Sequence, residues 1–141
     1  MYIAASKAKK YTLMKKEMIN IEYILDNVSQ LSLWNQLTTP LGLSAWFADK
    51  VSVKNNEYTF KWHKEYIQKA KAVLIIPEVK IRYRWEEETD ASAYFEFAIQ
   101  TMELTKTTAL RVTDFVEPDD KSSSIELWNS QIDTLKRTLG V

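Results

Sequence analysis

The sequence predicts an α+β fold in which a long C-terminal helix packs across an antiparallel sheet. Apolar and polar residues alternate through most of positions 51–115, a pattern typical of strands with one buried face. The connections between these strands are shorter than the dozen or more residues that a parallel crossover needs. A sheet with one apolar face must be covered, and the apolar-striped C-terminal segment is the element long enough to cover it.

The composition excludes several classes of site. The 141 residues carry 19 basic and 19 acidic side chains, with only two glycines, one histidine and no cysteine. Two glycines are too few for a P-loop or a dinucleotide fingerprint. The absence of cysteine removes disulfides, thiolate metal sites and cysteine nucleophiles, and a zinc site would need unusual partners for the single histidine. We therefore expect no metal, no cofactor and no catalytic residue.

Charge is distributed unevenly along the chain. Residues 1–16 hold five lysines and no acid, so the remaining residues carry a net charge of −5. We interpret residues 1–16 as a basic extension without fixed structure, and residues 17–141 as one domain. Met14 and the residues after it look like a natural start, which suggests that residues 1–13 are an upstream extension. No signal peptide or apolar run of membrane-spanning length is found, so a cytoplasmic location is expected.

The first part of the domain reads as a strand and two short helices. Residues 18–25 alternate as a strand does. The first helix is expected to bury residues spaced three apart: Val28, Leu31, Trp34 and Leu37. In the second helix, Thr39 is the expected N-cap, Pro40 takes the first helical position, and the buried stripe consists of Leu43, Trp46 and Phe47.

Six strands and a long helix follow. The predicted strands are residues 51–54, 57–62, 66–76, 79–85, 94–104 and 107–115, with Asn55-Asn56 as a hairpin turn. Ser123 and Glu126 match a capping box at the start of the last helix, and Gly140 is placed to end it. A curved sheet wrapped round one long helix is a helix-grip arrangement, which leaves space for an apolar cavity near the short helices.

Three segments resemble START-like domains, and more narrowly the activator of heat-shock protein 90 ATPase homologue family. They are residues 33–40 (LWNQLTTP) with Trp46-Phe47 following, residues 110–115 (LRVTDF) and residues 127–136 (LWNSQIDTLK). The resemblance extends over residues 18–141. It implies a helix-grip fold and either a hydrophobic ligand or a chaperone as partner.

The aromatic residues are the largest candidate signal for a site, with five Trp, seven Tyr and five Phe. Large rings are also what fills a core, so each is either a core residue or part of a ligand cavity. The cavity candidates are Trp46, Phe47, Phe60, Trp62, Ile81, Tyr83, Phe95, Phe97, Asp114, Trp128, Ile132 and Leu135. For Asp114 two interpretations stay open: an inward-facing polar anchor, or an exposed acid at the end of a strand.

Other charged residues fit ordinary structural roles. His63 lies between charged neighbours and is expected on a turn or the surface. The run Glu86–Glu88 has the wrong spacing for an oxygen-ligand loop and is expected to be a solvated turn. Lys80, Arg82 and Arg84 form a basic strand face, but the acidic run beside them argues against nucleic-acid binding.

These observations support a non-enzymatic binding module that holds a small hydrophobic molecule between the sheet and the C-terminal helix. The alternative is a protein-interaction domain of the ATPase-activator kind. A cyclase or hydrolase is less favoured, because it would require Asp114, His63 and Tyr83 to converge on one substrate atom. Self-association through a strand edge stays open.

Overall fold

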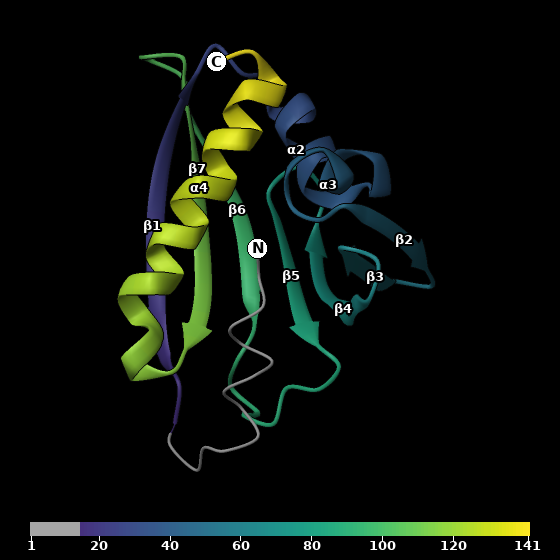
Figure 1. The fold of residues 1–141 in the computed structure, drawn as a ribbon. Coiled ribbons are helices and arrows are strands. Elements are labelled where there is room, and N and C mark those ends of the chain that lie inside the picture. Colours follow the sequence, from purple (N-terminus) through teal and green to yellow (C-terminus); the bar gives the residue numbers. More distant parts are fainter. Residues whose placement is uncertain (1–14) are drawn as a thin grey trace.

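The strands that come first and last along the chain are neighbours in the sheet, although most of the sequence separates them (Figure 1). The computed structural model describes residues 15–141. Its elements are β1 (Glu17–Asp26), α2 (Gln30–Thr38), α3 (Pro40–Trp46), β2 (Lys50–Lys54), β3 (Glu57–Trp62), β4 (Tyr66–Ile76), β5 (Lys80–Trp85), β6 (Phe95–Met102), β7 (Thr107–Val116), the 3-10 turn η2 (Pro118–Asp120) and α4 (Lys121–Leu139). The strands form one antiparallel sheet in the order β1-β7-β6-β5-β4-β3-β2, which confirms the predicted fold class.

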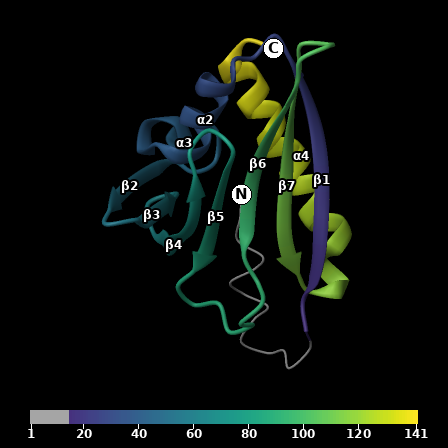
Figure 2. The same cartoon turned by 180° about the vertical axis from the view of Figure 1, so that it is seen from behind.

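Helix α4 lies across one face of the sheet over β1, β7 and β6, and the short helices α2 and α3 lie beside it (Figures 1 and 2). Its buried face includes Trp128, Ile132 and Leu135, as the spacing predicted. Gly140 ends the helix with a φ of 80°, a left-handed conformation that glycine adopts without a steric cost. The predicted capping box is wrong. The helix begins at Lys121, so Ser123 lies inside its first turn and donates to the carbonyl of Asp120.

The predicted buried face of α2 is also partly wrong. Leu33 and Leu37 are fully buried, whereas Leu31 is 55% exposed. Ser29 caps the helix, because its side-chain oxygen accepts from the backbone N–H of Ser32. Three residues on an α-helix turn about 60° less than a full turn, so a series of positions three apart, such as the one predicted here, moves off the buried face. Leu33 and Leu37 are four residues apart and therefore stay on it. For α3 the predicted cap and stripe are confirmed, with Thr39 accepting from the N–H of Gly42.

The last turn of α2 is held by aromatic side chains. Three consecutive backbone carbonyls that the helix itself leaves without donors each accept one hydrogen bond from an aromatic side chain. The pairs are Trp46 Nε1 to Gln36 O (2.8 Å), Tyr83 Oη to Leu37 O (2.7 Å) and Tyr58 Oη to Thr38 O (2.7 Å). Rings from α3, β5 and β3 therefore fix the end of α2 against the sheet.

Helices α2 and α3 approach each other at Gly42. A Cβ atom at this position would lie 2.2 Å from the carbonyl oxygen of Asn35 and 2.7 Å from the Cα of Gln36. Both are backbone atoms that cannot rotate away. The glycine is therefore required by the close contact, not by its backbone conformation.

We expect Gly42→Ala to lower the free energy of unfolding by about 2 kcal/mol, the usual scale for overpacking a tight contact. Chemical denaturation measures this change. Leu41→Ala is the matched control on the same helix, because the Leu41 side chain is 86% exposed. Equal stability of the two variants would contradict the assigned contact.

Tyr23 links β1 to α4 by donating from Oη to Asn129 Oδ1 at 2.7 Å. Partial burial, and then the negative charge of Asp133, raise the pKa of Tyr23 to about 12 from its usual 10.0. Burial also raises the pKa values of Tyr58 and Tyr83. All three groups are therefore held neutral in the folded state at a pH where the unfolded chain ionises them.

The contribution of these tyrosines to the free energy of unfolding should therefore be fully present below pH 10. It should be lost as the pH rises from 10 towards 12. Tyr23→Phe should make this fall shallower, because it removes one of the three groups. Denaturant midpoints measured at several pH values test the prediction. An unchanged slope in the variant would show that Tyr23 contributes nothing to the alkaline loss.

Candidate ligand-binding groove

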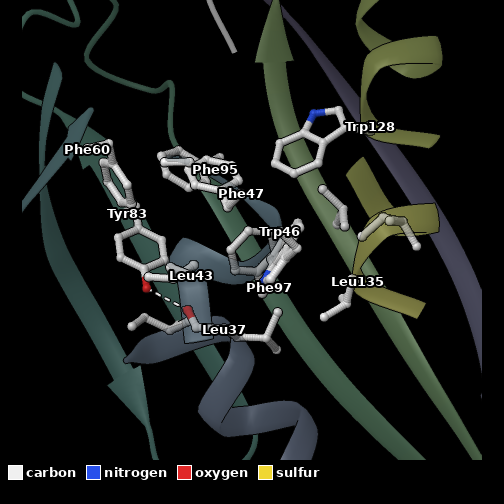
Figure 3. Packing of buried hydrophobic residues seen from close by; sticks show 14 of the residues in the cluster. Leu37, Leu43, Trp46, Phe47, Phe60, Tyr83, Phe95, Phe97, Trp128 and Leu135 are labelled. Atoms are coloured by element: carbon white, nitrogen blue, oxygen red, sulfur yellow. Dashed lines mark hydrogen bonds between the residues drawn. The ribbon is translucent and has the colours of Figure 1, made fainter. Parts of the chain in front are cut away.

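The aromatic residues predicted for a cavity lie together between the sheet and the helices (Figure 3). All twelve predicted residues are buried, with exposed fractions of 6% or less. The apolar members come from α3, β3, β5, β6 and α4 and belong to one continuous cluster. The prediction that these side chains point inward from their strands and helices is therefore confirmed. Whether they contact a ligand stays a prediction.

Phe47, which directly follows α3, is the centre of this cluster. Its ring lies 5.2 Å from the ring of Phe60, 5.8 Å from that of Phe95 and 6.0 Å from that of Trp128, measured between centroids. Figure 3 shows Phe47 pointing into the group formed by Phe95, Phe97 and Trp128. These spacings are those of packed aromatic pairs. Rings thus occupy much of the space between the sheet and α4.

Asp114 faces inward, which decides between the two interpretations of this residue. Its side chain is 2% exposed; Oδ2 accepts from Trp128 Nε1 at 2.9 Å and Oδ1 accepts from the N–H of Phe115 at 2.8 Å. A buried carboxylate needs such donors, because an uncompensated charge in a core is strongly destabilising. Asp114 therefore anchors α4 to β7 through the indole of Trp128.

A groove of about 300 Å³ opens between α3 and α4 at the edge of the aromatic cluster. Three of the predicted residues, Trp46, Phe47 and Trp62, contribute to its lining. The other lining residues, which the sequence analysis missed, are Ser44, Ala45, Ala48, Asp49, Ser130, Gln131 and Thr134. Small side chains on α3 and polar ones on α4 carry no distinctive spacing, so the groove becomes evident only when the two helices are placed together.

Gln131 is the most unusual of these lining residues. It lies one position before Ile132 on the buried face of α4 and is 6% exposed. Its Nε2 donates to the carbonyl of Phe47 at 3.2 Å, and the same carbonyl accepts from Trp62 Nε1 at 2.9 Å. Within residues 15–141, Gln131 Oε1 is buried without a hydrogen-bond partner. Leaving an acceptor in this state costs free energy, so it calls for an explanation.

The remaining charged candidates take structural roles. His63 is exposed, has a φ of 57° in the β3–β4 turn, and donates its backbone N–H to Asp49 Oδ2 at 2.6 Å. Glu88 departs from the predicted solvated turn, because its side chain is 5% exposed and pairs with Lys16 Nζ at 2.6 Å. Lys16, placed by the sequence in the N-terminal extension, is thereby tied to the β5–β6 connection; predictions for residues 1–14 lie outside the described residues.

The basic strand face on β5 is largely satisfied within the protein. Arg82 Nε lies 2.8 Å from Glu96 Oε1, and Lys80 Nζ lies 3.8 Å from Glu96 Oε2. Arg84 donates to the backbone carbonyls of Asp90, Ala91 and Ala93 in the loop that precedes β6. These partners explain how three basic residues are accommodated along one strand, and the expectation that this face binds no nucleic acid stays a prediction.

Comparison with known proteins agrees with this architecture. The sequence matches the START-like superfamily domain over residues 13–141, which is most of the chain. The chain belongs to the START-like superfamily. The solution NMR structure of BfR322 from Bacteroides fragilis is 40% identical to this START-like chain, with a TM-score of 0.65, and the match covers 89% of this chain and 92% of that one. No protein of curated function matches the chain.

More distant structures share the fold. The Aha1 dimer from Colwellia psychrerythraea is 20% identical with a TM-score of 0.70, over 86% of this START-like chain and 96% of the Aha1 chain. DynU16, a putative protein in the dynemicin biosynthetic locus, is 13% identical with a TM-score of 0.73, over 88% of this chain and 47% of its own. In the part of this START-like chain that the structure describes, no helix is long and apolar enough to cross a membrane.

The bond between Asp114 and Trp128 should be measurable as a coupling free energy. We expect Asp114→Leu and Trp128→Phe each to destabilise the protein, and the double variant to lose about 2 kcal/mol less than the sum, because the two side chains share one charge-assisted hydrogen bond. Denaturation of the four proteins gives the coupling. Simple additivity would mean that the two groups do not depend on each other.

Proposed function

We propose that the protein binds a small hydrophobic molecule in the groove between α3 and α4, without catalysing a reaction on it. The observation that carries this proposal is the groove of about 300 Å³ with Trp46, Phe47 and Trp62 in its lining. Ligand sites are concave, mostly apolar, and contain a few polar groups that orient the ligand. The volume lies at the lower end of their usual range, which favours a molecule of one or two rings or a short alkyl chain.

The relatives support a ligand-binding role. The chain belongs to the START-like superfamily, and membership of it implies a hydrophobic ligand. DynU16, which shares the fold, is a putative protein in the dynemicin biosynthetic locus. The groove lies at the edge of the space between the sheet and α4, where a ligand would contact both the core rings and solvent.

The absence of catalysis is supported by the partners of the three residues that an enzyme of this kind would need. Tyr83 Oη donates to Leu37 O, and Asp114 accepts from Trp128 and from the N–H of Phe115. His63 lies on the exposed β3–β4 turn. The Tyr83 hydroxyl and the Asp114 carboxylate are thus engaged in holding the fold, and none of the three residues lines the groove.

A protein-interaction role, as in the ATPase-activator resemblance, is the second candidate. Leu31 on α2 is 55% exposed, and Ile76 and Val79 at the β4–β5 turn are 43% and 41% exposed. Gln30 Nε2 donates to the carbonyl of Glu78 at 2.6 Å, which holds this turn beside α2. Exposed apolar side chains brought together in this way favour contact with another protein, and the relative from Colwellia psychrerythraea is a dimer.

Ligand binding is tested with 6-propionyl-2-dimethylaminonaphthalene, a neutral two-ring probe whose fluorescence emission shifts to shorter wavelength in apolar surroundings. We expect saturable binding to the wild-type protein and a loss of at least tenfold in affinity for Ala45→Trp. Ala45 is exposed and lines the groove, so an indole at this position would fill the site without disturbing the core.

Leu41→Trp is the matched control, since it adds an indole to the same helix outside the groove. It should bind the probe as the wild-type protein does. Equal binding by both variants would place the probe elsewhere. No binding by the wild-type protein, together with reversible dimers in sedimentation experiments, would favour the interaction role instead.

A further inference from the structure

The polar groups around the groove are mainly hydrogen-bond acceptors. Gln131 Oε1 is an acceptor, and its assignment as oxygen follows because Nε2 donates to the carbonyl of Phe47. Within residues 15–141 this oxygen has no hydrogen-bond partner, and the side chain that carries it is 6% exposed. Asp49 adds a carboxylate at the edge of the groove.

Most of the side-chain donors beside the groove already have acceptors within the protein, and the second N–H of Gln131 Nε2 and the Ser130 hydroxyl are the exceptions. Ser44 Oγ donates to the carbonyl of Pro40 at 2.6 Å, and Thr134 Oγ1 donates to the carbonyl of Ser130 at 3.4 Å. The indole N–H groups of Trp46 and Trp62 donate to backbone carbonyls. The hydroxyl of Ser130 stands on an exposed residue of α4, where water competes for it.

The charges at the groove also disfavour an anionic ligand. Among the described residues that line it there is one acid, Asp49, and no lysine, arginine or histidine. Arg137 donates from Nη2 to Thr134 Oγ1 at 3.1 Å, but its own side chain is exposed and does not line the groove. A ligand carboxylate would therefore meet a buried amide oxygen and a second carboxylate, without a cation to pair with.

We propose that the ligand is a neutral molecule with an O–H or N–H donor at one end, such as a phenol, an alcohol or an amide, and that this donor binds Gln131 Oε1 after the Gln131 side chain turns its buried oxygen toward the groove. The inference rests on the proposed function, because it specifies what enters the same groove. It excludes fatty acids and other anionic amphiphiles. A ligand donor would satisfy the one acceptor of Gln131 that the fold leaves unused, while its apolar part contacts Trp46 and Trp62.

Three compounds of similar size test the inference: 4-propylphenol as donor, 4-propylanisole as the matched ether, and 4-propylbenzoate as the anion. In titrations followed by NMR we expect the phenol to bind about fivefold to tenfold more tightly than the anisole, the usual effect of one hydrogen bond. The benzoate should show no saturable binding. The side-chain amide resonances of Gln131 should shift with the phenol and much less with the anisole.

Gln131→Leu should abolish the preference for the phenol, so that the phenol and the anisole bind with about equal affinity, while anisole binding is retained. The variant is expected to fold, because the carbonyl of Phe47 keeps Trp62 Nε1 as a donor. Glu126→Leu, at an exposed position of α4 that does not line the groove, is the control and should keep the preference. If Gln131→Leu does not fold, the wild-type ligand series and the amide shifts still decide.

The outcomes separate the two proposals. If none of the three compounds binds, the proposed function fails. If phenol and anisole bind equally well to the wild-type protein, the groove is a ligand site but the donor inference is wrong. Tighter binding of the benzoate would overturn the inference directly, and an unchanged preference in Gln131→Leu would assign the donor's partner to another residue.

Discussion

The structure depends on how the aromatic core satisfies its own polar groups. Rings fill a large part of the space between the sheet and the helices, but tyrosine and tryptophan carry an O–H or N–H group inward with them. Four of these groups end on backbone carbonyls of residues 36–38 and 47, in and next to the short helices. A fifth, on Trp128, ends on Asp114. The hydrogen bonds that the rings require are therefore the same bonds that position α2, α3 and α4.

Because glycine is scarce, other residues adopt the left-handed backbone conformation that several turns require. Among residues 15–141, six residues other than glycine have positive φ values: Asn27, Asn55, Asn56, His63, Glu78 and Lys106. Asparagine tolerates this conformation best, and the Asn55-Asn56 pair forms the β2–β3 turn as its sequence predicts. At Glu78 and Lys106 the strands on either side impose the turn, at a local cost of about 1 kcal/mol each. The glycine at position 42 is retained where two backbones touch.

Patterns of apolar residues predicted the elements well, because period and burial are linked in strands and long helices. The seam of α4 and the alternation in β3 and β5 were correct for this reason. Short helices have too few turns to define a face, which explains the error at Leu31. The roles of Asp114 and Gln131 depend on partners at distant positions in the chain, Trp128 and Phe47. Pairing of this kind leaves no local pattern in the sequence, so the groove could not be predicted.

The pairing of β1 with β7 has a consequence for how the chain folds. Glu17 lies opposite Val116 and Asp26 opposite Thr107, so the two strands are separated by roughly 80 to 100 positions along the chain. During synthesis on the ribosome, β1 emerges long before its neighbour exists. Contacts this remote slow folding and leave a half-apolar ribbon without a partner in the meantime. The nascent chain should therefore depend on protection from aggregation until its last hairpin has emerged.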